Sequence, residues 1–103
     1  MSEKEKKQSR SELLYEGILR LENVDECKKF FQDLCTVSEL RAMEQRFEVA
    51  ILLSDGMIYH DILERTGASS ATISRVNRSL QYGANGYQAI LPRVQELRTA
   101  EEK

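Results

Sequence analysis

The fold of this chain is decided by one short stretch near its middle, TGASSATISRV at positions 66–76. Thr66 and Gly67 are typical of the end of a helix, because glycine adopts the left-handed backbone conformation found there without steric cost. Ser69 follows, and its hydroxyl can accept a hydrogen bond from one of the unpaired N–H groups that open the next helix. The stretch therefore predicts two helices joined by a tight turn, a helix-turn-helix over about residues 58–82.

The second helix of this pair, expected from 70 to about 82, has two unlike sides. Ile73, Val76 and Leu80 share one side of it, which predicts that this side packs on the rest of the protein. The opposite side carries Ala71, Ser74, Arg75, Arg78 and Tyr82, with Ser70 beside them at the N-terminal end. Small side chains allow close approach to a DNA major groove, and hydroxyl and guanidinium groups can bond base edges or phosphates.

We therefore predict that this helix contacts double-stranded DNA. The expected contact residues are Ser69, Ser70, Ala71, Thr72, Ser74, Arg75 and Arg78. Arg78 is expected to hold a phosphate, and the N–H groups at the start of the helix can do the same. The residues alone leave one alternative open, an ordinary amphipathic helix whose serine-rich side is simply solvated.

The charge balance neither requires nor excludes a nucleic-acid partner. The chain carries a net charge of −2, whereas many DNA-binding domains are strongly basic because neutralising phosphates supplies much of their affinity. Between Thr66 and Gly83, however, the only charged residues are Arg75 and Arg78. The lack of strong basicity also fits an alternative function, a helical dimer that binds proteins rather than DNA through the same face.

Length and composition predict a single all-helical domain. Hydrophobic residues make up 41% and charged residues 31% of the 103 residues, as in globular rather than disordered proteins. We expect a charged, mobile tail at 1–10 and one helical domain at 11–103. Apolar runs fall short of the ~20 residues of a membrane span and no signal peptide is recognised, so a cytoplasmic protein without a membrane partner is expected.

Start signals predict the first three helices. The pairs Ser9–Glu12 and Thr36–Glu39 have the spacing of a capping box, and Asn23–Glu26 is a related signal. The helix that begins at Thr36 is expected to be the longest, to end near Asp55 and to have Gly56 as its stop. Its inner face is expected to carry Leu40, Met43, Phe47, Ala50 and Ile51.

Three further helices complete the expected chain. A short helix over about 58–65 is anchored by Ile62, and its start is poorly capped because Met57 and Ile58 cannot serve as N-caps. The helix at 70–82 follows, and a last helix is expected over 87–97, where Pro92 either kinks it or sits in its first turn. Helices this short rarely bury all their apolar faces within one small chain. The first two helices and the last are therefore expected to pack against a second copy in a two-fold dimer.

Cysteine and histidine offer little for catalysis or metal binding. Cys27 and Cys35 match no zinc spacing and are expected to be reduced structural thiols, with a redox switch or an intermolecular disulfide as the alternative. His60 and Glu64 share a helix face, which gives two metal ligands but not a site. A nucleophile and base with a specific spacing cannot be assembled. We expect neither a metal site nor an enzyme.

Beyond these local patterns, the run from Leu34 to Leu80 resembles the Trp repressor family, and especially its YerC/YecD-type branch. The matching residues are Leu34, Thr36, Glu39, Arg46, Gly56, Gly67, Ala68, Ala71, Thr72, Ile73, Ser74 and Arg75, with 77–80 beside them, and GASSATISR at 67–75 is the most specific piece. The resemblance implies a six-helix Trp-repressor-like fold, an intertwined homodimer and DNA recognition by the fifth helix. It also implies repression rather than activation, at a palindromic operator.

The resemblance further implies a small-molecule site. In Trp repressor, tryptophan lies between the third helix and the recognition helix, against two arginines whose positions match Arg46 and Arg75. Thr36 matches a residue near that pocket. A guanidinium can pair with a carboxylate and stack on an aromatic ring. Two departures count against tryptophan, because Val76 stands where the repressor has a glycine and the segment before Gly67 is one residue shorter. We expect that no corepressor binds, and tryptophan or another small molecule is the alternative. A surface or inter-subunit ion pair is the alternative role of Arg46.

Overall fold

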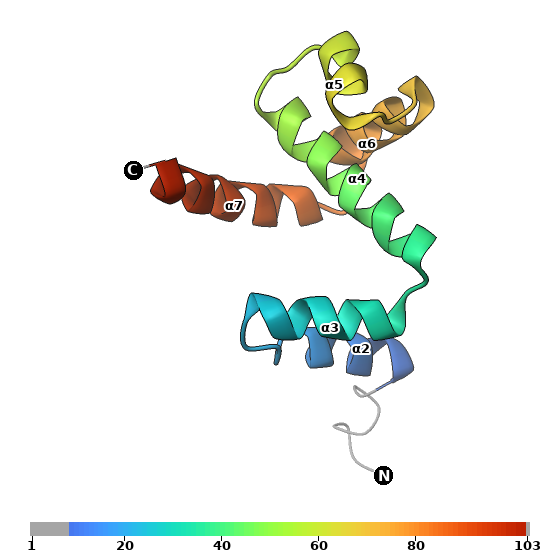
Figure 1. Cartoon of the computed structure of the whole chain (residues 1–103), viewed down its shortest axis with the longest axis vertical. Helices are drawn as coiled ribbons and strands as arrows, with labels where there is room; N and C mark the ends of the chain where they lie inside the picture. The colour runs from blue at the N-terminus through green and yellow to red at the C-terminus, as the bar shows by residue number, and fades with distance from the viewer. Residues whose placement is uncertain (1–8, 103) are drawn as a thin grey trace. The chain divides into compact units, whose positions relative to one another are not determined.

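Six helices make up the part of the chain that the structure describes, residues 9–102, and no strand occurs among them. In the computed structural model they are α2 (Arg10–Ile18), α3 (Val24–Leu34), α4 (Val37–Ser54), α5 (Tyr59–Thr66), α6 (Ser70–Tyr82) and α7 (Gly86–Glu102) (Figure 1). The all-α prediction is confirmed. The predicted tail at 1–10 lies outside the described residues except for Ser9, which caps α2, and Arg10, which begins it. The chain divides into two compact units, Met1–Leu40 and Arg41–Lys103, with the division inside α4.

The helices of the first unit begin where the sequence signals place them. At the start of α4, the N–H of Glu39 donates to Thr36 Oγ1 over 3.1 Å, and the N–H of Thr36 donates to Glu39 Oε1 over 2.8 Å. This is a complete capping box. At the start of α3, Asn23 Oδ1 accepts from the N–H of Glu26 at 2.8 Å, while the Glu26 carboxylate accepts from the N–H of Glu22 at 3.0 Å. Local side-chain oxygens therefore define both helix starts.

The first unit buries little of its apolar surface. Within residues 9–40, the structure encloses no side chain completely. Phe30 and Phe31 are half-buried and meet edge to face with ring centroids 5.3 Å apart. Tyr15 and Leu19 remain 61% and 79% exposed. Short helices depend on tertiary packing for their stability, and this unit leaves much of its apolar surface exposed in the single chain.

Both cysteines belong to the first unit. Cys27 lies in α3 and Cys35 directly follows that helix, and both are free and half-buried. Along a helix this separation corresponds to roughly 12 Å, which is too far for the two cysteines to form a disulfide with each other.

The core of the second unit joins α4, α5, the tight turn and α6. The buried residues are Val49, Ala50 and Leu52 of α4, Ile62 of α5, Ala68 of the turn, and Ile73 and Val76 of α6. Of the predicted inner face of α4, Ala50 is buried, whereas Leu40, Met43, Phe47 and Ile51 are half-buried. The core forms around the C-terminal turns of α4, so Val49 and Leu52, which the prediction omitted, are enclosed instead.

The end of α4 is a glycine-containing cap. The N–H of Gly56 donates to the carbonyl of Leu53, and the N–H of Met57 donates to that of Leu52, both over 3.0 Å. This is the hydrogen-bond pattern of a Schellman motif, with Asp55 as its C-cap residue. Gly56 has a φ of +88°, in the left-handed region that favours glycine. The predicted stop at Gly56 is confirmed.

The last helix is longer than predicted and encloses its proline. Because α7 begins at Gly86 and reaches Glu102, Pro92 lies in its interior, and the alternative that placed Pro92 in the first turn is wrong. Proline has no N–H, so the carbonyl of Gln88 lacks its usual helical partner. The described helices include none that is long and apolar enough to cross a membrane.

Candidate nucleic-acid interface

The tight turn between α5 and α6 is fixed by Thr66. Its Oγ1 donates to the carbonyl of Ile62 over 2.8 Å and accepts from the N–H of Ala68 over 3.0 Å. Its carbonyl accepts from Gln45 Nε2 of α4 over 3.3 Å. The turn is thereby bonded to the helix before it, to the residue after it and to α4.

Two residues of this turn behave as the sequence predicts. Gly67 ends α5 with a φ of +74° in the left-handed region, and its N–H donates to the carbonyl of Leu63 over 2.9 Å. Ser69 caps α6, because its Oγ accepts from the N–H of Thr72 over 3.1 Å. The start of α5 has Ile58 at its N-cap position without a side-chain cap, also as predicted. The helix-turn-helix therefore spans residues 58–82.

The two sides of α6 have the predicted environments. Ile73 is 0% and Val76 2% exposed, and Leu80 is half-buried against the same core. The side that faces solvent carries Ser70, Ala71, Ser74, Arg75 and Arg78, all exposed. Five of the seven predicted DNA-contacting residues therefore lie on one open surface, which we call the α6 face.

The other two predicted contact residues are already engaged in the cap. Ser69 Oγ and Thr72 Oγ1 lie 3.1 Å apart, and Ser69 Oγ also accepts the N–H of Thr72. Thr72 is half-buried, whereas Ser69 is exposed. Their hydroxyls hold the start of α6 in shape, so they define the orientation of the α6 face and offer fewer free lone pairs to a ligand.

The charge on the helix-turn-helix is divided between its two helices. Arg75 and Arg78 are the only charged side chains of α6, and both are exposed. The α5 helix carries exposed acids, and Glu64 lies 3.4 Å from His60 Nε2 on its solvent side. The α5 helix also carries the exposed Arg65, so α6 is distinguished by bearing arginines without any acid. His60 and Glu64 are exposed as expected, and residues 9–102 hold no cluster of three or more metal-ligating side chains.

Comparison with known proteins places this geometry in a family. The family model described as Trp repressor protein matches residues 9–95. The chain belongs to the Trp repressor family. It is 50% identical over 86 residues to a protein of Bacillus subtilis (strain 168) called uncharacterized protein YerC, covering 84% of this chain and 83% of the relative.

Two solved structures of the Trp repressor type have the same fold. A TrpR-like protein from Eubacterium eligens ATCC 27750 superposes with a TM-score of 0.79 at 47% identity, covering 88% of this chain and 95% of that one. A Trp repressor candidate from Staphylococcus aureus superposes with a TM-score of 0.80 at 45% identity, covering 92% and 96%. The Trp-repressor-like fold predicted from the sequence is confirmed.

The residues that the Trp repressor resemblance assigns to a ligand site belong to both units of the chain. Arg46 of α4 and Arg75 of α6 are both exposed side chains of the second unit. Thr36 belongs to the first unit, and its hydroxyl is occupied by the capping box with Glu39. Val76, at the position of the repressor's glycine, is 2% exposed and fills the core with its branched side chain.

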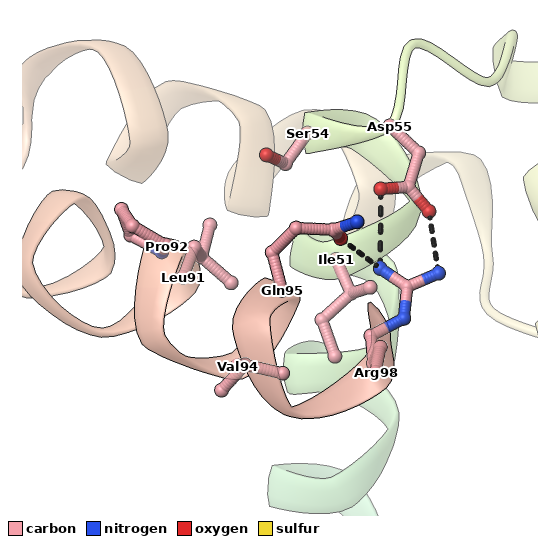
Figure 2. Close-up of a pocket in the computed structure, with 8 residues that line it drawn as sticks. All are labelled: Ile51, Ser54, Asp55, Leu91, Pro92, Val94, Gln95 and Arg98. Atoms are coloured by element: carbon pink, nitrogen blue, oxygen red, sulfur yellow. Dashed lines mark hydrogen bonds and ion pairs between the residues drawn. The ribbon is translucent and has the colours of Figure 1, made fainter. Parts of the chain in front are cut away.

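One hollow of the second unit lies between the end of α4 and α7, and none of its lining residues belongs to α6 (Figure 2). It measures about 240 Å³ and is lined by Ile51, Ser54, Asp55, Leu91, Pro92, Val94, Gln95 and Arg98. Arg98 and Asp55 form an ion pair at its edge, with Nη2 and Oδ2 2.9 Å apart. This pair could not be predicted from the sequence, because no local pattern joins residues 43 positions apart in the chain.

Proposed function

We propose that this protein is a sequence-specific transcriptional repressor that binds a palindromic operator as a two-fold dimer. The observation that carries this proposal is the α6 face. A helix whose apolar side is fixed in the core presents Ser70, Ala71, Ser74, Arg75 and Arg78 to solvent behind a rigid turn. The α6 face has small polar side chains and two arginines but no acid, which suits entry of the helix into a major groove.

The contacts divide by chemistry. Arg78 is assigned to a phosphate, as are the first N–H groups of α6, which bring the partial positive charge of a helix start. Ser70, Ala71 and Ser74 are short and lie toward that N-terminal end, so they are assigned to base edges. Arg75 reaches either a guanine edge or a phosphate.

Dimer formation supplies the second recognition helix. The first unit encloses none of its described side chains, and Leu19 is 79% exposed. A second copy that covers this surface stabilises both chains and places two α6 faces about one DNA turn apart. The dimer would act on the chromosome in the cytoplasm, without a catalytic role.

Small-molecule control is not part of the proposal. Arg46 and Arg75 carry the charges that a carboxylate effector would need, but the branched Val76 occupies the place of the repressor's glycine. We therefore expect DNA binding without a corepressor and treat amino acids as a variable in the test.

The test is selection of bound duplexes from a random DNA pool, with and without a mixture of free amino acids. We expect an enriched palindrome in both conditions. Enrichment only with amino acids would restore a corepressor site. The double variant Arg75→Ala, Arg78→Ala should enrich nothing, whereas Arg93→Gln, which removes an exposed arginine of α7, should select the wild-type palindrome. The absence of enrichment with the wild-type protein would overturn the proposal in favour of a protein-binding helical dimer.

A further inference from the structure

Contacts near both ends of α7 hold it on the rest of the second unit, with Leu91 packed against the core between them. Near its start, the ring of Tyr87 stacks with that of Phe47 of α4 at a centroid distance of 6.5 Å. The side-chain amide of Gln88 donates to the carbonyl of Leu80 in α6. Arg98 makes the second contact about three helical turns later, roughly 16 Å along the axis. Two contacts so far apart fix the direction of α7 as well as its position.

The second contact is a two-point ion pair. Arg98 Nη2 donates to Asp55 Oδ2 over 2.9 Å and Nη1 donates to Oδ1 over 3.2 Å. Nη1 also donates to Gln95 Oε1 over 2.9 Å, which holds the guanidinium in place (Figure 2). Paired forks of this kind are the most directional ion pairs in proteins. The three other ion pairs found within residues 9–102 each join side chains only four positions apart in the chain.

Apolar packing beside the ion pair is incomplete. The hollow of about 240 Å³ lies beside the ion pair, among Ile51, Leu91 and Val94. Side chains that border an open space lose contacts on that side. The direction of the C-terminal half of α7 is therefore set mainly by the pair between Asp55 and Arg98.

Asp55 occupies the joint between α4 and the helix-turn-helix. It is the C-cap residue of α4, and the next residue, Gly56, turns the chain with its φ of +88°. Met57, which follows, packs against the core and leads into α5. The Arg98 guanidinium, which binds Asp55, therefore influences the direction in which the helix-turn-helix leaves α4.

We propose that the Asp55–Arg98 ion pair is a positioning device, which sets the angle between α7 and the helix-turn-helix and thereby the half-site spacing that the dimer accepts. This inference rests on the proposed function. Ile90 and Leu97 of α7 are 39% and 61% exposed, so α7 offers apolar surface to a second copy while α6 offers its face to DNA. In a two-fold dimer, the separation of the recognition helices follows from this angle.

Loss of the ion pair should change the half-site spacing that the dimer accepts and not the contact of α6 with a single half-site. Without the pair, the helix-turn-helix samples a wider range of angles, and DNA binding must select among them. Affinity for the optimally spaced palindrome should fall about threefold to tenfold, the cost of ordering one or two more groups. Duplexes with one base pair added or removed between half-sites should lose less relative affinity than with the wild-type protein. Affinity for a single half-site should not change.

The test measures binding to a spacer series of the selected palindrome. The variants are Arg98→Gln and Asp55→Asn. Arg98→Lys is a milder change, which keeps the charge but loses the paired hydrogen bonds to the carboxylate. Arg93→Gln is the matched control, because it removes the same charge from the same helix. Circular dichroism melting identifies which variants are folded. The charge-swapped double variant, Asp55→Arg with Arg98→Asp, should recover part of the spacing preference.

The outcomes separate the two proposals. A flattened spacer profile for the Asp55 and Arg98 variants, with an unchanged profile for Arg93→Gln, supports the positioning role. Folded variants that keep the wild-type profile overturn it and leave the proposed function intact. A wild-type protein that binds no duplex overturns the proposed function, and the positioning role with it.

Discussion

Ile62 of α5 and Ile73 of α6 are both 0% exposed and lie in the same buried cluster. This relationship holds the two helices of the helix-turn-helix together by their apolar sides. Because the buried side of α6 is occupied by Ile73 and Val76, its polar side is left to solvent. Substitutions on the two sides of α6 should therefore separate folding from recognition.

Truncation of Ile73 should destabilise the fold. Ile73→Ala removes a completely buried side chain and leaves a cavity, which costs about 2–5 kcal/mol. Ser74→Ala, at the next position on the exposed side, should change the free energy of unfolding by no more than about 0.5 kcal/mol. Urea denaturation of both variants measures the difference. Equal effects at the two positions would mean that the orientation of α6 described above is wrong.

The two glycines at 17 and 67 should respond oppositely to alanine. Gly67 has a φ of +74° with open space around it, so Gly67→Ala should cost about 1–2 kcal/mol through backbone strain alone. Gly17 lies inside α2, also with open space around it, and Gly17→Ala should stabilise the protein by about 0.5–1 kcal/mol through lower chain entropy. Thermal unfolding measures both changes. A stabilising Gly67→Ala would contradict the left-handed turn.

Loss of the cap on α6 should destabilise the protein less than truncation of Ile73 does. Ser69→Ala removes the oxygen that accepts the N–H of Thr72 and should cost about 1 kcal/mol. Ser69→Gly should cost only about a few tenths of a kcal/mol, because glycine is tolerated at N-caps. Ser70→Ala is the matched control, since Ser70 is the first residue of the helix. A melting temperature that is unchanged in Ser69→Ala would show that the cap contributes nothing.

The assembly state should depend on the first unit. We expect sedimentation to show a dimer at micromolar concentration, because Tyr15 and Leu19 are 61% and 79% exposed in the single chain. The double variant Tyr15→Ser, Leu19→Ser should shift the equilibrium toward monomer by reducing the apolar surface available for burial. Leu63→Ser, which changes an exposed leucine of α5, should remain dimeric. A wild-type protein that sediments only as monomer would contradict the dimer.

Features governed by nearby residues could be predicted from the sequence. The capping box of Thr36 and Glu39, the turn at Gly67 and the cap at Ser69 each depend on groups within a few residues, so their spacing is visible in the chain. The two sides of α6 follow from helical periodicity. Local signals also predicted the six helices, whereas their arrangement in a Trp-repressor-like fold came from the family resemblance.

Features governed by contacts between distant segments could not be predicted from the sequence. Periodicity alone did not reveal that the core forms at Val49 and Leu52, because the position of the neighbouring helices decides which arc of α4 is enclosed. The pair of Asp55 and Arg98 joins side chains 43 positions apart and has no local signature. The interior position of Pro92 depends on where α7 begins, which no start signal in the sequence marked.

The central claim is that the α6 face binds DNA, and the salt dependence of binding tests it most directly. The measurement is fluorescence anisotropy of the selected palindrome over a range of salt concentrations, with the wild-type protein, Arg78→Ala and Arg93→Gln. We expect the wild-type affinity to fall steeply with salt. Arg78→Ala should bind more weakly with a slope reduced by about 1, because one phosphate contact is lost. Arg93→Gln should match the wild-type protein. Affinity that is insensitive to salt, or an Arg78→Ala variant that binds like the wild-type protein, would contradict the claim.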